Sequence, residues 1–431
     1  MDLFQLFSYI MLCILILSFI KIRYGACLFV LYMIVVPAMN LNIAGFQIGE
    51  NYINTIFLFS LIYHKYITGF QYEYGPIKLI IIYFIFCLIF LPFSDNVYGF
   101  ESLDRWRRNS MMNIFFPLVI YNIIMEDTKS IVYFRNIVLF AIFLTIGYGY
   151  VQVMLDGLNP YQVTLMTLEG IDPYEMNKYY AAEGEGRLFG HMSSVFRHPM
   201  SFGLFIGLSV LYLFYIRKEI NQYVFYFLFV ITCIMAILCG VRSTIGGLMF
   251  SLLYIILKQA NKKIIMYSAC YIFIILFVIS FIPDVSDYVG SIFSSGEKSA
   301  VRGSSLSSRW VQFVGAFNEF IRNPFFGLGY SWTDIYLEHN ELHPICYAFE
   351  SLIYMVMCNL GIAGIILWIW LIKNILRYNK SYCENIYIDS ILVFYICYSS
   401  ITGDYGYMKL FLIFYILMLG ESMNKQNKVL V

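Results

Sequence analysis

Long apolar stretches recur along the whole chain and are separated by short polar turns. Most of them have about 17 residues or more, the length that a helix needs to cross a bilayer. We count about 13, with a range of about 11 to 14, which predicts an all-α polytopic membrane protein. The stretches fall at about 3–20, 24–39, 52–68, 77–93, 111–125, 131–155, 199–216, 222–240, 244–258, 264–282, 347–372, 386–402 and 408–422.

The composition agrees with a chain that lies largely in lipid. Its 431 residues are 60% hydrophobic and 13% charged, whereas a soluble domain is about 25% charged. The ten cysteines lie mostly inside apolar stretches, without paired or metal-like spacing, so we expect them to be buried small side chains. Lys21 and Arg23 follow the first apolar stretch and no basic residue precedes it, which favours a retained span over a cleaved signal.

Lysine and arginine in the short turns predict which side of the membrane each turn faces. Two long loops, at about 156–198 and 283–346, fall on the less basic side, outside the cytoplasm. We expect residues 1–431 to form a single integral membrane domain, with these two loops as a cap over the active site. The turns expected in the cytoplasm hold Lys21, Arg23, Lys65, Lys129, Arg217, Lys218, Lys258, Lys262, Lys263, Lys373, Arg377, Lys380, Lys425 and Lys428.

The second of these loops contains a clear amphipathic pattern. Ser307 or Ser308 can begin a helix that ends at Asn323-Pro324, before the glycines of FFGLGY. A helix with aromatic side chains on one face suits a position flat on the membrane surface. The apolar positions are Trp310, Phe313, Val314, Phe317, Phe320 and Ile321, and Gln312, Glu319 and Arg322 fall on the other side.

Four arginines are candidates to bind a lipid pyrophosphate: Arg187, Arg197, Arg242 and Arg309. All four fall on the expected outer side, and a guanidinium binds phosphate through two parallel hydrogen bonds. Arg242 stands between two apolar spans, where inserting an arginine costs about 2.5–3.5 kcal/mol, and snorkelling to the interface is its alternative role. For Arg187 and Arg197 the alternative is an ordinary solvated loop.

A second basic group surrounds Trp106 in the sequence Arg105-Trp106-Arg107-Arg108. We favour an interfacial anchor for this group, and phosphate contact is the alternative.

Glu350, His339 and His343 are the candidate general bases. We expect Glu350 in the first turn of a helix, where a carboxylate also complements the helix dipole. The apolar residues of the sequence FESLI around it would raise its pKa toward that of a useful base. Two histidines could belong to a metal site, but the outer loops offer no third ligand at a recognisable spacing, so we expect neither metal nor cofactor.

Three pieces of this sequence can be compared with known motifs. They read GRLFGHMSSVFRHPMSFG, then CGVRSTIGG, then SSRWVQFVGAFNEFIRNPFFGLGY followed by NLGIAG. The last and most specific pairs an Asn-Pro-Phe-x-Gly-x-Gly stretch with a later Gly-x-x-Gly stretch. Together the pieces resemble the O-antigen polymerase and ligase superfamily of bacterial envelope glycosyltransferases, over about residues 185–365.

The resemblance implies a GT-C-like membrane glycosyltransferase fold with an outer catalytic cavity under a helical cap. It implies an undecaprenyl-pyrophosphate-linked glycan as donor, arginines on the pyrophosphate, and no metal. Arg242 and Arg309 match the family's arginine positions. In ligases, a histidine about eleven residues before the Gly-Leu-x-Gly glycines activates the acceptor, and that spacing back from Gly361 falls on Glu350.

A glutamate in place of the ligase histidine favours a polymerase for O-antigen or capsular polysaccharide. We expect it in the bacterial inner membrane, with its active site facing the periplasm. The expected partners are lipid-linked glycans and membrane lipids, with a chain-length regulator and a flippase of the same pathway, and no nucleic acid.

A ligase that moves finished glycan to a lipid A core is the nearest alternative. A transporter or flippase for the lipid-linked unit is a further one, although most spans here carry no charge at mid-membrane. An ordinary polyprenyl-phosphate-sugar transferase would need an acidic motif in the first outer loop, which offers only Glu50.

Overall fold

Helices make up most of the chain in the computed structural model, which describes residues 3–36, 41–43, 46–168, 172, 192–259, 306–382, 385–403 and 407–429. Two short strands, β1 (Leu41–Ile43) and β2 (Phe46–Ile48), pair antiparallel. The first helices are α1 (Leu3–Ile20), α2 (Ile22–Val35), α3 (Glu50–Thr68), α4 (Ile77–Phe90), the 3-10 turn η1 (Leu91–Phe93), α5 (Phe100–Glu126), α6 (Ser130–Met154) and α7 (Pro160–Leu168). They are followed by α9 (Pro199–Ile216), α10 (Gln222–Leu238), α11 (Arg242–Gln259), α14 (Leu306–Arg322), α15 (Trp332–Asn340), α16 (Leu352–Tyr382), α17 (Ile386–Ile401) and α18 (Tyr407–Val429).

The predicted apolar stretches coincide with these helices wherever the chain is described, and the stretch at 264–282 lies outside the described residues. Among the described helices, α6, α9 and α16 are long and apolar enough to cross a membrane. Shorter apolar helices run over Gln5–Ile20, Ile22–Val35, Ile77–Phe93, Gln222–Leu238 and Ile386–Ile401. The chain is therefore an all-α polytopic membrane protein, and the number of spans stays a prediction.

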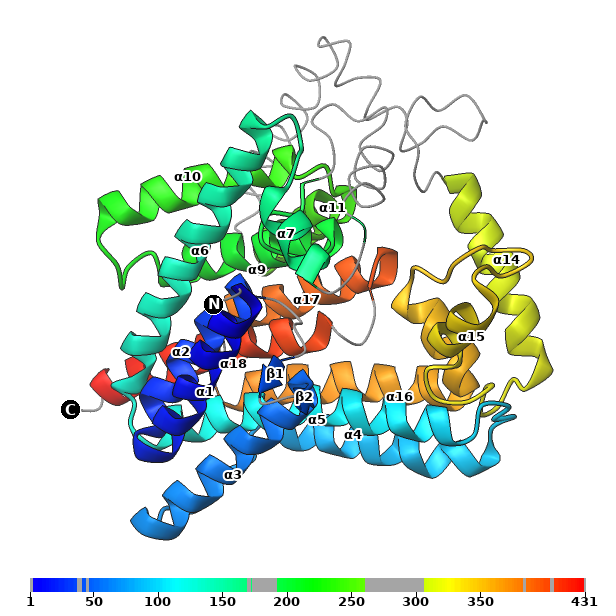
Figure 1. The fold of residues 1–431 in the computed structure, drawn as a ribbon, viewed down its shortest axis with the longest axis horizontal. Helices are drawn as coiled ribbons and strands as arrows, with labels where there is room; N and C mark the ends of the chain where they lie inside the picture. Colours follow the sequence, from blue (N-terminus) through cyan, green and yellow to red (C-terminus); the bar gives the residue numbers. More distant parts are fainter. Residues whose placement is uncertain are drawn as a thin grey trace.

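Small residues let the central helices of this bundle approach closely. The ring of Phe394 on α17 lies against Gly207 of α9 and Gly247 of α11. A Cβ added at these glycines would come within 2.0 Å and 2.8 Å of that ring. Glycine at a helix contact is common in membranes, where association depends on close van der Waals packing. Figure 1 shows α9, α11, α17 and α18 together in the middle of the molecule.

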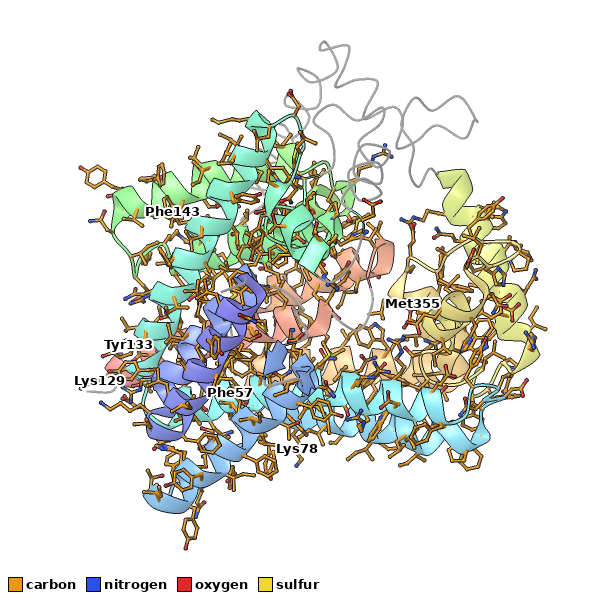
Figure 2. The ribbon with its side chains drawn as sticks, in the orientation of Figure 1. Phe57, Lys78, Lys129, Tyr133, Phe143 and Met355 are labelled. Carbon is orange, nitrogen blue, oxygen red and sulfur yellow. The ribbon has the colours of Figure 1, made fainter. Side chains whose placement is uncertain are left out.

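Ion pairs join helix ends and turns at each end of the bundle. At one end, Arg23 pairs with Asp127, Arg135 with Glu421 at 3.2 Å, and Lys425 with Glu219 at 3.4 Å. At the other end, Lys409 pairs with Glu50, Arg105 with Glu338, and Arg309 with Glu350 at 2.9 Å. Lys129 and Met355, labelled in Figure 2, lie toward the first and the second end respectively. These pairs join segments that the charge pattern places on the same side of the membrane, and the assignment of the two sides to cytoplasm and periplasm stays a prediction.

Helices α14 and α15, which we call the cap helices, cover the second end of the bundle (Figure 1). The amphipathic helix predicted before Asn323-Pro324 is confirmed as α14. Its aromatic and aliphatic side chains Trp310, Phe317 and Ile321 are exposed, whereas Gln312 and Ala316 are buried toward α16. Because the apolar side faces outward, this helix can contact lipid with one face and the protein with the other. That residues 156–198 and 283–346 together cap an active site stays a proposal.

We predict that the buried pair at the first end is needed for stability. Glu421 is 1% exposed and contacts Arg135. Glu421→Gln leaves a buried guanidinium with less compensation, so we expect a loss of about 3 kcal/mol and a melting midpoint lower by several degrees. Thermal unfolding of the purified protein in detergent measures it. The matched control is Glu338→Gln, in an exposed Arg–Glu pair, which should change stability by less than about 0.5 kcal/mol. Equal effects of the two changes would contradict this account.

Candidate functional site

Arg242 is the first residue of α11 and lies half-buried at the second end of the bundle. The turn before it is tight, with Gly240 at φ +69°, where glycine is favoured. The next residue, Ser243, shares a hydrogen bond of 2.8 Å with Thr402, which directly follows α17. The start of α11 is thereby fastened to the C-terminal end of α17.

Glu350 is fastened to the same end of α17. The backbone N–H of Gly403 donates to the Glu350 carbonyl at 3.0 Å, and the Ser351 hydroxyl donates to the Ser400 carbonyl at 2.7 Å. Glu350 lies two residues before α16 begins at Leu352, so the expected position in the first helical turn is wrong. Ser243 follows Arg242 and Ser351 follows Glu350, and both serines contact residues 400–403. The two candidate residues are therefore held at the same end of α17.

Arg309, in the first turn of α14, contacts Glu350 directly. Its Nη2 lies 2.9 Å from the Glu350 carboxylate, and its Nη1 donates to the Gln312 side-chain oxygen at 2.8 Å. Burial lowers the pKa of the Arg309 guanidinium, and the Glu350 charge opposes that lowering. The structure thus joins a predicted phosphate-binding arginine directly to a predicted base.

The surroundings of Glu350 differ from the apolar setting expected from its neighbours in sequence. Phe349 and Leu352 are buried, but the Glu350 side chain is 43% exposed and its carboxylate faces a guanidinium. Residues adjacent in sequence lie in a different setting because this segment is irregular and precedes the start of the helix. A contact across 41 positions, and not the local sequence, determines what surrounds this carboxylate.

Arg197 lies near the start of α9, directly before His198, whose Nδ1 accepts from the Met200 N–H as a helix cap. Burial lowers the pKa of Arg197. The backbone N–H of Met192 donates to the Cys239 carbonyl at 3.3 Å, so this segment lies beside the turn that leads to Arg242. Arg187 lies outside the described residues.

His343 is buried inside the cap and is 2% exposed. Its Nδ1 accepts from the Cys346 backbone N–H at 3.2 Å, which leaves Nε2 to donate to Glu319 at 3.3 Å. This histidine therefore joins α14 to the loop after α15, and its described contacts do not include Arg309 or Glu350.

His339 lies on the outside of the cap and is 52% exposed. Its Nε2 is 3.0 Å from the Glu101 carboxylate, and its ring stacks on Tyr98. These contacts join α15 to the start of α5. Of the three candidate bases, only Glu350 contacts one of the candidate phosphate-binding arginines among the described interactions.

The basic group around Trp106 has partners inside the protein. Arg107 and Arg108 both pair with Asp104 at 2.6 Å, and Arg105 pairs with Glu338 of the cap. The Trp106 indole N–H donates to the Phe84 carbonyl at 2.7 Å. This tryptophan is directed into the bundle, which the preference for an interfacial anchor did not anticipate.

The motif glycines of the third piece form a backbone connection between the cap and α16. Gly361, at φ +62° and ψ −154°, interrupts the helical geometry of α16. In an unbroken helix, residues 362 and 363 would donate to the carbonyls of 358 and 359. Here Ile362 and Ala363 donate instead to the carbonyls of Pro324 and Phe325, at 2.8 Å and 3.1 Å.

The freed carbonyls of α16 receive donors from the same loop. Leu328 and Gly329 donate to Cys358 and Asn359 at 2.8 Å and 3.1 Å. Four bonds between segments thus replace two within the helix, which satisfies the backbone in an environment with little water. The approach is close, because a Cβ at Gly327 would lie 2.4 Å from the Asn359 carbonyl carbon. The FFGLGY and NLGIAG pieces therefore position α14, and with it Arg309.

Gln312 is a partner of Arg309 that the sequence did not single out, although the helical pattern placed it on the polar side of the helix. Its spacing of three from Arg309 places the two side chains on one helical face. Among the described residues, no group of three or more histidine, cysteine and acidic side chains is arranged so that it could hold a metal ion. The expectation of a metal-free site stays a prediction.

Residues 227–369 match the O-antigen ligase family. The matched stretch contains Arg242, Arg309, Gln312 and Glu350, and both halves of the backbone connection. The match supports the superfamily of O-antigen polymerases and ligases, and with it a role in O-antigen or polysaccharide assembly from lipid-linked glycans. It does not separate a polymerase from a ligase. A comparison with curated proteins finds no match to this chain.

We predict that Gly361→Ala disrupts the backbone connection. The positive φ and a Cβ at 2.6 Å from the Pro324 carbonyl oxygen together should cost about 3 kcal/mol or more. The matched control is Gly147→Ala in α6, where an added Cβ meets nothing within 4 Å and helix propensity favours alanine by up to about 1 kcal/mol. Melting midpoints in detergent compare the two. A Gly361→Ala protein as stable as the control would contradict the role assigned to this break.

We also predict different reactivity for the two cap histidines. Diethyl pyrocarbonate should modify the exposed His339 and leave the buried His343 largely unmodified, because the reagent needs access to a ring nitrogen. Peptide mass spectrometry after brief treatment of the folded protein measures both sites. Denaturing the protein before treatment is the control and should make both histidines reactive. Equal modification in the folded protein would show that His343 is accessible.

Proposed function

We propose that this protein is a polysaccharide polymerase. It joins undecaprenyl-pyrophosphate-linked oligosaccharide repeat units into O-antigen or capsular polysaccharide, on the periplasmic side of the bacterial inner membrane. The observation that carries the proposal is the Arg309–Glu350 contact at 2.9 Å, at the end of the bundle covered by the cap helices. It brings together a side chain suited to phosphate and one suited to accept a proton.

In the proposed reaction, the pyrophosphate of the growing chain binds Arg309 and Arg242, with Arg197 or Arg187 in support. A sugar hydroxyl of a second lipid-linked unit attacks the anomeric carbon of the first. The new glycosidic bond forms as the bond to pyrophosphate breaks, and Glu350 takes the hydroxyl proton. Stabilising the charge on the departing pyrophosphate is the largest contribution, because the arginines act where water is scarce. A loop histidine, His339 or His343, is the alternative base.

Each transfer in this scheme is a single displacement, so it inverts the configuration at the anomeric carbon and needs no metal. Growing chain and repeat unit both carry a lipid pyrophosphate, which requires space for two such groups at the outer rim. A flippase of the same pathway would deliver the units, and a chain-length regulator would limit their number.

A ligase is the second candidate, and the match to the O-antigen ligase family favours it. It would use the same arginines to release the same lipid pyrophosphate, but its acceptor would be a lipid A core or another finished acceptor. Against it stands Glu350, at the position where the ligases carry a histidine.

The test is polymerisation by the purified protein in detergent, with a lipid-pyrophosphate-linked repeat unit as the only substrate. We expect a ladder of products on a gel. Arg309→Ala should lower the rate about 10²- to 10³-fold by removing charge stabilisation, and Glu350→Gln about 10²- to 10⁴-fold by removing the base. His339→Ala is the matched control and should retain the ladder if Glu350 is the base.

Other outcomes distinguish the alternatives. Transfer that occurs only when a core-lipid acceptor is added would establish a ligase. Retention of anomeric configuration in the product would contradict the single displacement. Loss of the ladder in His339→Ala with activity kept in Glu350→Gln would make the histidine the base. If the parent protein forms no ladder and transfers no glycan, the transporter is favoured.

A further inference from the structure

The two ends of the Arg309 guanidinium are held by different kinds of partner. Nη1 donates to the Gln312 side-chain oxygen at 2.8 Å, and Nη2 faces the Glu350 carboxylate at 2.9 Å. The first partner is a neutral amide and the second is an anion. The Arg309 side chain itself is 17% exposed.

The neutral partner is built into the same helix as the arginine. Gln312 is buried and follows Arg309 by three residues in α14, so the two side chains move together with that helix. A buried amide that accepts from a guanidinium restricts the rotation of its planar group. Gln312 therefore fixes the direction in which the other guanidinium nitrogen points.

The anionic partner belongs to the opposite side of the contact. The Glu350 backbone is bonded to Gly403, and the next residue is bonded to the Ser400 carbonyl, so this segment moves with the bundle. Its carboxylate is much more exposed than the amide of Gln312. An ion pair whose carboxylate is open to solvent contributes little net free energy, so another anion can replace this carboxylate at small cost.

We propose that Glu350 occupies the phosphate-binding nitrogen of Arg309 until a pyrophosphate displaces it, while Gln312 is a positioning residue that keeps the guanidinium in place during the exchange. The inference rests on the proposed function, because the pyrophosphate is that of the lipid-linked donor. No covalent bond changes in this step. One anion replaces another on a guanidinium that stays charged, and the carboxylate is released with its lone pairs available.

The exchange gives the proposed reaction an order. While Glu350 is paired with Arg309, its carboxylate accepts from the guanidinium and is not free to accept a hydrogen bond from an acceptor hydroxyl. Donor binding releases it at the moment when a leaving group is in place. An acceptor hydroxyl is therefore deprotonated only when a donor is present.

Binding of inorganic pyrophosphate to the purified full-length protein tests this without requiring catalysis. Titration calorimetry in a buffer with EDTA gives the dissociation constant for the parent and each variant. Glu350→Gln removes the competing anion, so pyrophosphate should bind about 3- to 10-fold more tightly. Gln312→Met removes the acceptor at similar volume, so pyrophosphate should bind about 3- to 10-fold more weakly.

Two matched controls accompany these variants. Glu338→Gln removes the carboxylate of the exposed Arg105–Glu338 pair, and Asn318→Met replaces an exposed amide on α14. Both should leave the affinity for pyrophosphate within about twofold of the parent. Melting midpoints of all the variants should match the parent, which separates positioning by Gln312 from a loss of structure.

Several results would overturn the inference. These are unchanged or weaker binding in Glu350→Gln, equal tightening in Glu338→Gln, parent-like binding in Gln312→Met, or no binding by either the parent or Glu350→Gln. Failure of the proposed function has a different signature. If no glycan product forms but the pyrophosphate affinities change as expected, the polymerase proposal fails and the exchange on Arg309 stands.

Discussion

Backbone hydrogen bonding in an apolar environment is the constraint on which the arrangement of this protein depends. A span that breaks its helix must find new partners for the groups that it frees, because little water is available there. At Gly361 these partners come from the loop after α14, which bonds α16 on both sides of the break. These backbone hydrogen bonds fix the position of the cap helices on the bundle. The position of Arg309 follows from them, and so does its meeting with Glu350.

Ion pairs form within the arrangement that these backbone hydrogen bonds fix. The two ends of the bundle both carry ion pairs, but those pairs differ in burial. Glu421 is enclosed with its arginine, which suits a permanent structural contact, whereas Glu350 is open to solvent beside a mostly buried arginine. A buried pair resists exchange because each charge would lose its compensation. The open pair can exchange partners, and it lies at the end of the molecule to which the proposed function assigns the pyrophosphate.

Much of the fold could be predicted from local sequence. An apolar stretch indicates a helix surrounded by lipid, and an amphipathic stretch indicates a helix at an interface. The end of α14 before Asn323-Pro324 followed from the proline in the same way, whereas the helix begins at Leu306, ahead of the serines expected to cap it. Contacts between distant segments produce no such local pattern and could not be predicted in this way. The pairing of Arg309 with Glu350, the inward direction of Trp106 and the burial of His343 all depend on partners far away in the chain. Gln312 could have been found, because its spacing from Arg309 is a local signal, but its importance appears only once the guanidinium has a second partner.

The connection between cap and span also affects how such a protein can diverge. Main-chain hydrogen bonds do not depend on the identity of the surrounding side chains, provided that the few glycines where the loop meets α16 are kept. Substitutions elsewhere in the cap can accumulate without moving it. A lineage could therefore alter the outer surface of the cap while the geometry around Arg309 and Glu350 stays unchanged. Under the proposed function, new glycans would then be accommodated on a scaffold whose anchoring tolerates mutation.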